Sequence, residues 1–224
     1  MRSKSNFVHA DVPDVILFDW DNTLIDSWNT IHAALSETFI KMGHAPWSLE
    51  ETKQRVQHSL RDSFPSLFGE HWQDAAQTFY KSFEKLHLKK LKPMPYAEEM
   101  LSSVLRIVPI LGVISNKTGV YLRKEVVHLN WCDYFVDVIG AGDAEKDKPN
   151  SAPVNLFRKN NLSKNEQVIW YVGDSEIDIA TANSSGCVSI LINDQNARRN
   201  IPDKIFSDLE FSDCRELATF LKNL

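Results

Sequence analysis

Cysteine is scarce in this sequence. The chain of 224 residues has only Cys132, Cys187 and Cys214, which are odd in number and far apart. Zinc sites and the disulfide frameworks of small secreted domains use short, regular cysteine spacings, so neither is indicated here. The pattern is typical of a protein of the reducing cytoplasm.

Long apolar runs and an excess of one charge are also lacking. No segment approaches the length of a membrane span, and residues 1–14, which we expect to be frayed, contain no apolar core of signal-peptide length. The 25 Lys and Arg against 30 Asp and Glu give a net charge of -5, which does not favour nucleic acid or an anionic membrane. We therefore expect a cytoplasmic monomer or weak homodimer with no nucleic-acid or membrane partner.

The apolar segments that are present indicate two kinds of structure. Short apolar runs at 15–18, 110–115, 135–139, 168–172 and 188–192 read as strands, and helical segments alternate with the last four. Residues 27–91 contain no convincing strand, and their apolar residues recur at helical spacing. We predict an α/β fold: a doubly wound (Rossmann-like) parallel sheet at 1–26 and 94–224, with an all-helical insertion at 27–93 above the carboxyl ends of the strands.

Within the insertion we expect three helices. The first begins near Trp28, and the second follows Ser48, which forms a capping box with Glu51. The third runs from near His71 towards Leu88. The proline-containing stretch 62–69 is expected to interrupt the helices.

Two carboxylates follow the first strand directly. Asp19 and Asp21 crowd its carboxyl end, because the turn at Asn22-Thr23 breaks the strand there. Ligands of open α/β sheets bind at this end, and two close carboxylates are costly unless a cation or a shared proton offsets them. The competing interpretation is an ordinary strand-to-loop junction, in which Asp and Asn only make the turn.

Polar residues also follow two later strands. Ser115-Asn116 precedes a predicted helix, whose N-terminus could bind a phosphate, although both residues are also good helix caps. Lys146 and Lys148 lie in the next strand-to-helix loop, where a lysine suits phosphate. Composition alone does not choose between them, and either could be an ordinary surface lysine.

A further acidic pair follows the strand at 168–172. Asp174 and Asp178 lie near the start of the next helix and face the same end of the sheet. Magnesium prefers a few carboxylates completed by water. Alternatively, acidic residues simply favour helix N-termini.

Taken in order, these motifs resemble those of the haloacid dehalogenase superfamily of aspartate-nucleophile hydrolases, and within it the phosphoglycolate phosphatase-like branch. The similarity spans nearly the whole chain, with the four motifs at Asp19–Leu24, Ser115-Asn116, Lys148-Pro149 and Gly173–Asp178. The segments Asp26-Ser27 and Lys148–Pro153 are also similar to this branch, and the second selects Lys148 over Lys146. Dehalogenases of the superfamily lack an Asp two residues after the nucleophile, so Asp21 points to phosphoryl transfer.

The resemblance implies a magnesium-dependent phosphatase acting on a small phosphomonoester, such as phosphoglycolate, a sugar phosphate or a nucleotide. Asp19 is implied to attack phosphorus and form an aspartyl-phosphate. Asp21 is implied to protonate the leaving alcohol and later to take a proton from water. The partner is then a small phosphorylated metabolite.

The resemblance also implies the metal and phosphate ligands. Mg²⁺ is implied to bind Asp19, the main-chain carbonyl of Asp21 and Asp174, with Asp178 contributing directly or through water. The transferring phosphoryl group is implied to bind Ser115, Asn116 and Lys148.

The helical insertion resembles a cap domain, which closes over the active site and selects the substrate. Arg61 is the predicted substrate-binding residue, since it could grip a carboxylate or a second phosphate, though it could equally pair with a helix acid. His58 is more typical of a satisfied structural histidine than of a substrate ligand.

Two other functions stay open. A phosphosugar mutase would use the same core residues but pass the phosphoryl group to a sugar hydroxyl. A catalytically inactive relative would bind only a phosphorylated ligand or a protein, although this sequence retains both Asp19 and Asp21.

Overall fold

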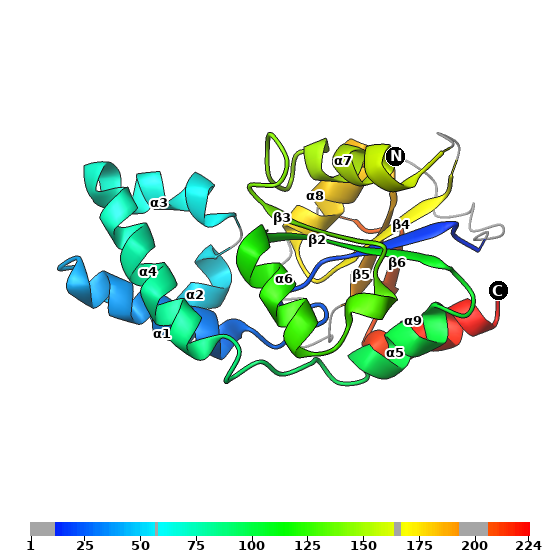
Figure 1. Ribbon diagram of the computed structural model, residues 1–224, viewed down its shortest axis with the longest axis horizontal. Coiled ribbons are helices and arrows are strands. Elements are labelled where there is room, and N and C mark those ends of the chain that lie inside the picture. Colours follow the sequence, from blue (N-terminus) through cyan, green and yellow to red (C-terminus); the bar gives the residue numbers. More distant parts are fainter. Residues whose placement is uncertain (1–11, 57, 164–166, 193–205) are drawn as a thin grey trace.

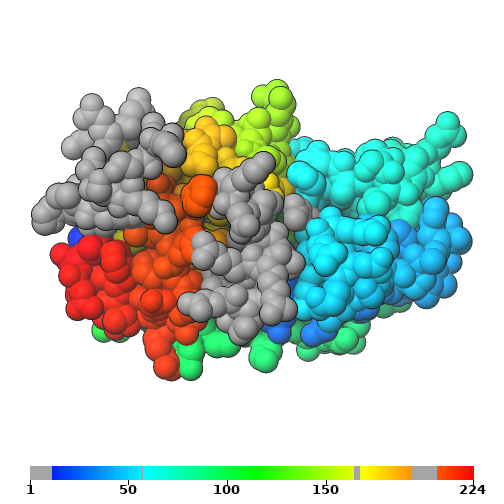
Figure 2. All heavy atoms as spheres, turned by 180° about the vertical axis from the view of Figure 1, so that it is seen from behind, coloured from blue at the N-terminus to red at the C-terminus, as the bar shows by residue number. Residues whose placement is uncertain are grey.

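The fold comes from a computed structural model that describes residues 12–56, 58–163, 167–192 and 206–224. Most of the expected frayed N-terminal segment falls outside these ranges. A sheet with helices on both faces forms one part of the molecule, and a group of helices forms the other (Figure 1). Figure 2 shows this group (blue to cyan) and the C-terminal helix (red) at opposite ends of the molecule. Within the described ranges, no helix combines the length and the apolar character needed to cross a bilayer.

The sheet has six parallel strands in the order β3-β2-β1-β4-β5-β6. The strands are β1 (Val15–Phe18), β2 (Ile110–Thr118), β3 (Asp137–Ala141), β4 (Ile169–Gly173), β5 (Val188–Ile192) and β6 (Leu209–Phe211). Because β1 lies between β2 and β4, residues that follow these three strands meet at one edge. The predicted doubly wound α/β fold is confirmed.

Both faces of β1 are covered, since its residues are fully buried and alternate between two apolar clusters. Ile16 and Phe18 pack on the face covered by α5, α6 and α9, while Val15 and Leu17 pack on the face covered by α7 and α8. The helices are α5 (Ala97–Val104), α6 (Gly119–His128), α7 (Ala152–Asn161), α8 (Glu176–Ser185) and α9 (Cys214–Lys222). A continuous apolar run such as 15–18 fits a strand buried on both sides.

The inserted segment folds into helices around a core of its own. The helices are α1 (Trp28–Lys41), α2 (Leu49–Arg55), α3 (Leu60–Phe68) and α4 (Trp72–Leu86), with a 3-10 turn at Gly69–His71. Phe39, Phe64 and Phe68 are buried in this core, with Phe39 and Phe68 ring centroids 5.3 Å apart. The capping box of Ser48 and Glu51 is formed, as predicted.

The predicted interruption at 62–69 is wrong, because α3 occupies this stretch and includes Pro65. Proline removes one helical hydrogen bond, but Phe64 and Phe68 pack on each other and against the rings of α1 and α4. Burial of these rings outweighs the lost bond.

Two strand predictions also need correction. The strand expected at 135–139 begins two residues later, because Phe135 instead packs against Trp20, with ring centroids 6.4 Å apart. Strand β6 was not predicted. It has only three residues, too few for a periodic pattern, and pairs with β5 along the sheet edge.

Candidate active site

The two carboxylates in the turn after β1 differ in how deeply they are buried. Asp19 is 6% exposed and follows the last strand residue directly, while Asp21 is half-buried beyond it. Asn22 adopts a left-handed conformation with φ 66°, which asparagine tolerates better than most residues. Trp20, between the acids, is fully buried and points into the core. The turn therefore separates two acids with different surroundings.

A buried lysine joins two of the acidic motifs. Lys148 Nζ lies 2.6 Å from Asp19 Oδ1 and 2.7 Å from Asp178 Oδ1, and Lys148 itself is 3% exposed. Burial raises the pKa of Asp19 to about 7, although the Lys148 ammonium acts in the opposite direction. Burial also acts to lower the pKa of Lys148, but the two carboxylates outweigh it and hold that pKa well above its ordinary range.

The loop that carries Lys148 is held by the second motif. Asn116 Oδ1 accepts a hydrogen bond from the Lys148 backbone N–H at 3.0 Å, and Asn116 Nδ2 donates to the Lys148 carbonyl at 3.2 Å. The preceding residue, Ser115, is buried, and the Ser115 Oγ accepts a hydrogen bond from the Lys117 N–H at 3.2 Å. Lys146, by contrast, is exposed. The structure thus brings Ser115, Asn116 and Lys148 to one edge of the sheet, and leaves Lys146 on the surface.

The loop after β4 supplies the remaining acids. Asp174 Oδ1 accepts from the Thr23 hydroxyl at 3.3 Å, while Asp178 Oδ2 accepts from Ser175 N at 3.1 Å and Oγ at 2.6 Å in a capping box of α8. A Cβ on Gly173 would lie 2.2 Å from Asp178 Cγ, so only glycine allows this close approach.

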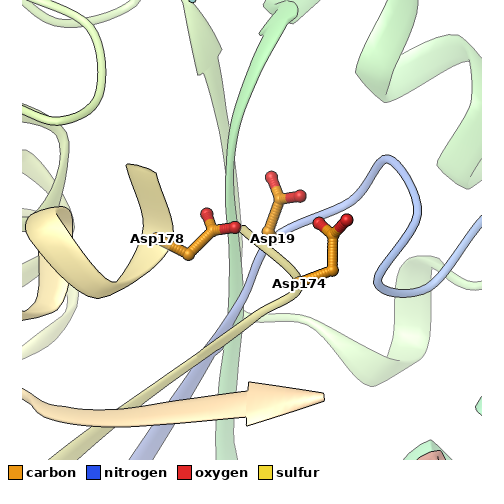
Figure 3. Close-up of side chains that lie close together, drawn as sticks. All are labelled: Asp19, Asp174 and Asp178. Atoms are coloured by element: carbon orange, nitrogen blue, oxygen red, sulfur yellow. The ribbon is translucent and has the colours of Figure 1, made fainter. Parts of the chain in front are cut away.

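These acids fit a hard divalent cation. One oxygen from each of Asp19, Asp174 and Asp178 lies within 4.8 Å of the others, and Figure 3 shows the three carboxylates converging. Poor hydration and the carboxylates of Asp178 and Asp19 raise the pKa of Asp174 well above its ordinary range. Lys148 balances only part of this charge, so a bound cation would relieve the remaining repulsion.

A second buried network, which the sequence analysis did not predict, contacts Asp21. Lys117 Nζ lies 2.7 Å from Asp21 Oδ1 and 2.5 Å from Glu125 Oε2. Asp21 Oδ1 also accepts a short hydrogen bond from the Ser27 hydroxyl. Burial acts to lower the pKa of Lys117, but Asp21 and Glu125 outweigh it and raise that pKa. The charged Lys117 side chain, which is buried in the core, therefore holds the Asp21 side chain in place.

Glu125 anchors this network from α6. It is 1% exposed and accepts from Trp20 Nε1 at 2.7 Å and from His87 Nδ1 at 2.9 Å, besides Lys117. Burial acts to raise the pKa of Glu125, yet Lys117, His87 and Trp20 together lower it. A sequence signal existed, because an acid at position 125 lies next to apolar Val126 and within a helical turn of buried Leu122.

Asp19, Asp21 and Asp174 line a cleft between the core and the helical insertion. The core side contributes Asp19, Asp21, Asn22, Ser115, Asn116, Lys117, Thr118, Tyr121, Lys148, Asp174, Ser175 and Ile177. The opposite side is made mainly of apolar and aromatic residues from α1 to α4. His58 is exposed and lines this cleft, which differs from the expected satisfied structural histidine.

Arg61 has a different environment from the one expected for a substrate ligand. Its Nε and Nη2 donate to the two carboxylate oxygens of Asp147, each at 2.6 Å, and Asp147 is buried in the loop before Lys148. Arg61 lines a separate pocket, together with residues 145–151 of this loop. The pairing with an acid is therefore present, but the acid belongs to a core loop and not to a helix.

Comparison with known proteins finds similar sequences among phosphatases and related hydrolases. Residues 16–192 match the family model of haloacid dehalogenase-like hydrolases. A phosphoglycolate phosphatase of Cereibacter sphaeroides strain ATCC 17029 is 30% identical over 76% of this chain and 81% of its own length. One from strain ATCC 17025 is 26% identical over 93% of this chain and 98% of its own.

Solved structures agree in fold. A haloacid dehalogenase-like hydrolase from Bacteroides fragilis superposes with a TM-score of 0.80 at 21% identity, covering 92% of this chain and 99% of its own. A predicted phosphoglycolate phosphatase from Haemophilus somnus reaches a TM-score of 0.76 at 17% identity, covering 95% of this chain and 99% of its own. At these identities the similarity concerns the fold alone.

Proposed function

Because this chain belongs to the haloacid dehalogenase-like hydrolase family, and to its phosphoglycolate phosphatase-like branch, we propose that it is a magnesium-dependent phosphatase of a small phosphomonoester. One observation carries the proposal: Asp19, Lys148, Asp174 and Asp178 converge at one sheet edge, and the first three line a cleft that also holds Asp21. We further propose that residues 27–93 act as the cap. A cytoplasmic monomer or weak homodimer acting on a small metabolite fits this proposal.

Asp19 is the proposed nucleophile. One Asp19 oxygen attacks phosphorus, the bond from phosphorus to the ester oxygen breaks, and an aspartyl-phosphate forms. Lys148 Nζ donates to Asp19 Oδ1 at 2.6 Å, which leaves Asp19 Oδ2 for the attack. Hydrolysis is thus divided into two steps, of which the first breaks the ester bond and the second breaks the aspartyl-phosphate.

Asp21 is the proposed acid and base. It gives a proton to the departing alcohol oxygen, then takes one from the water that attacks the aspartyl-phosphate, so that inorganic phosphate leaves and both acids are restored. The contact of Lys117 Nζ with Asp21 Oδ1 at 2.7 Å supports a fixed position for this side chain.

The cation would be held by Asp19, Asp174 and the main-chain carbonyl of Asp21. When bound, magnesium would shield the anionic nucleophile from the anionic phosphate. Asp178 has both oxygens engaged, by Lys148 and by Ser175, which favours a contribution through water over direct ligation. Asp178 therefore acts mainly by fixing Lys148.

The transferring phosphoryl group is proposed to bind Ser115, Asn116 and Lys148. The Ser115 hydroxyl accepts from Lys117 N, so its own proton can be donated to a phosphate oxygen. Asn116 fixes the Lys148 backbone through two hydrogen bonds. Lys148 supplies positive charge where negative charge develops.

The test is release of inorganic phosphate from a panel of phosphoglycolate, sugar phosphates, nucleoside monophosphates and an aryl phosphate, with magnesium and with chelator. We expect magnesium-dependent release that Asp19→Asn abolishes. Conversion of a sugar phosphate to its isomer without release would instead indicate a mutase. Absence of any turnover would contradict the proposed activity.

A further inference from the structure

The cleft has one polar wall and one apolar wall. The aromatic residues of the apolar wall are Trp28, Trp47, Phe64, Phe79, Tyr80 and Phe83 from the insertion, with Tyr121 beside them from the core. Phe64 and Phe83 are buried, whereas the other five are only partly buried and line the cleft. An apolar surface of this kind, next to a reactive site, calls for a ligand that covers it.

The aromatic wall is fixed in place. Tyr80 stacks on Tyr121 with ring centroids 5.2 Å apart and 16° between planes, which joins α4 of the insertion to α6 of the core. The Tyr80 hydroxyl bonds to Thr118 Oγ1 at 2.7 Å, so this polar tip is already occupied. Phe79 stacks on Phe83 in turn, with ring centroids 5.6 Å apart. The wall therefore offers ring surface more than hydrogen-bonding groups.

Positive charge for a second anionic group is sparse. Among the described residues, the lysines and arginines that line the cleft are Arg55, Lys117 and Lys148. Both lysines lie between pairs of carboxylates. The Arg55 side chain is 54% exposed, lies 3.5 Å from Glu51 and covers the Trp47 ring at 5.0 Å from its centroid. A carboxylate on the substrate would lose hydration against the rings and gain little in return.

The space suits a ring. The cleft measures about 170 Å³, including the space beside the acids. For comparison, an apolar cavity of about 150 Å³ accommodates benzene. We propose, on the basis of the phosphatase function above, that the substrate is the phosphomonoester of an apolar, ring-bearing alcohol. The phosphate binds at the sheet edge, and the ring of the alcohol packs against the aromatic wall.

The test compares esters whose leaving alcohols are similarly reactive. We would measure kcat/KM for 2-phenylethyl phosphate, ethyl phosphate and 2-phosphoglycolate with magnesium. We expect 2-phenylethyl phosphate to exceed ethyl phosphate by about 10- to 100-fold, the effect of burying one ring, and also to exceed 2-phosphoglycolate. Preference for 2-phosphoglycolate, lost in Arg55→Ala, would overturn this inference and leave the phosphatase proposal intact. Hydrolysis of none of the three, with turnover of a sugar phosphate or a nucleotide, would overturn this inference alone. Absence of turnover with every ester of both panels would overturn the phosphatase proposal as well.

Variants locate the effect. Trp28 lines the cleft but is not among the residues of the insertion's apolar core, so Trp28→Ala removes wall surface with little loss of packing. We expect it to lower the kcat/KM ratio of 2-phenylethyl to ethyl phosphate several-fold, mainly through KM for the larger ester. Phe79→Leu should lower the same ratio. The control is Ile40→Ala, which is 64% exposed on α1 and outside the cleft and should leave the ratio unchanged. An equal ratio in all these proteins would contradict the proposed contact.

Discussion

The two walls of the cleft are stabilised by different physics. On the core wall, charged side chains have fixed partners, such as Lys148 with Asp19 and Asp178, or Lys117 with Asp21 and Glu125. On the insertion wall, rings pack on rings, as Phe79 does on Phe83. Buried charges tolerate few substitutions, because removing one leaves another unpaired, whereas apolar walls accept changes of similar volume. This difference fits the roles that we propose for the two walls, catalysis on the core side and substrate selection on the insertion side.

Removal of the buried Lys148 ammonium group should have the largest effect. In Lys148→Met, Asp19 and Asp178 lose their shared partner, and the phosphate loses a positive charge. We expect phosphatase activity to fall by about a hundredfold or more and the free energy of unfolding to fall by about 3 kcal/mol. Activity assays and urea unfolding would measure both. Lys146→Met, two residues away and exposed, is the matched control, and similar behaviour of the two variants would contradict the assignment.

Disruption of the Glu125 network should have an intermediate effect. Glu125→Gln keeps the volume but cannot accept from Lys117, His87 and Trp20 as a carboxylate does. We expect kcat to fall about tenfold, with a smaller change in KM, because Lys117 no longer fixes Asp21. The control is Glu84→Gln, an exposed acid that pairs with Lys124. Equal kinetics in both variants would show that the network only supports folding.

The pH dependence of stability tests the same network. The pKa of Glu125 in the folded protein lies below its ordinary value of 4.5. Its ionised form therefore stabilises the fold above about pH 4.5, and this contribution is lost as the pH falls through the folded-state pKa. The difference in unfolding free energy between the wild type and Glu125→Gln should shrink on acidification below that pH. A constant difference down to pH 3 would contradict the pairing.

Arg61→Ala should have the smallest effect on activity. Its side chain is 40% exposed and pairs with Asp147 outside the cleft, so Arg61→Ala removes a partly solvated ion pair between α3 and a core loop. The Asp147 side chain is only 1% exposed and then keeps just the Gly142 N–H, at 3.1 Å, among the donors of the described residues. We expect a loss of about 1 to 3 kcal/mol in unfolding free energy, no large loss of activity, and KM values close to those of the wild type. A large rise in KM for phosphoglycolate would return Arg61 to the role of a substrate ligand.

The sequence predicted the core wall better than the insertion wall, for a physical reason. Asp19, Lys148 and Asp174 follow parallel strands, and Ser115 lies in the second half of β2, where the apolar pattern predicts the end of that strand. The carboxyl ends of such strands meet at one edge whatever the details of packing. Their positions along the chain were therefore enough to bring them together. The aromatic wall depends instead on how four helices pack, which periodicity alone does not fix.

Other features depended on tertiary contacts that no local pattern contains. The helix around Pro65 forms because Phe64 and Phe68 are buried by other helices. Glu125 meets His87 from 38 residues away along the chain. Lys117 adjoins a recognised motif, but its contact with Asp21 required the sheet to be assembled.

The central claim is that Asp19 becomes phosphorylated during turnover. Asp21→Asn should still react with phenyl phosphate, whose leaving group needs little protonation, but should fail to activate the water that clears the enzyme. Acid quenching followed by peptide mass spectrometry should then find one phosphoryl group on the peptide containing Asp19. Full turnover by Asp19→Asn, or a phosphoryl group on another residue, would contradict this account.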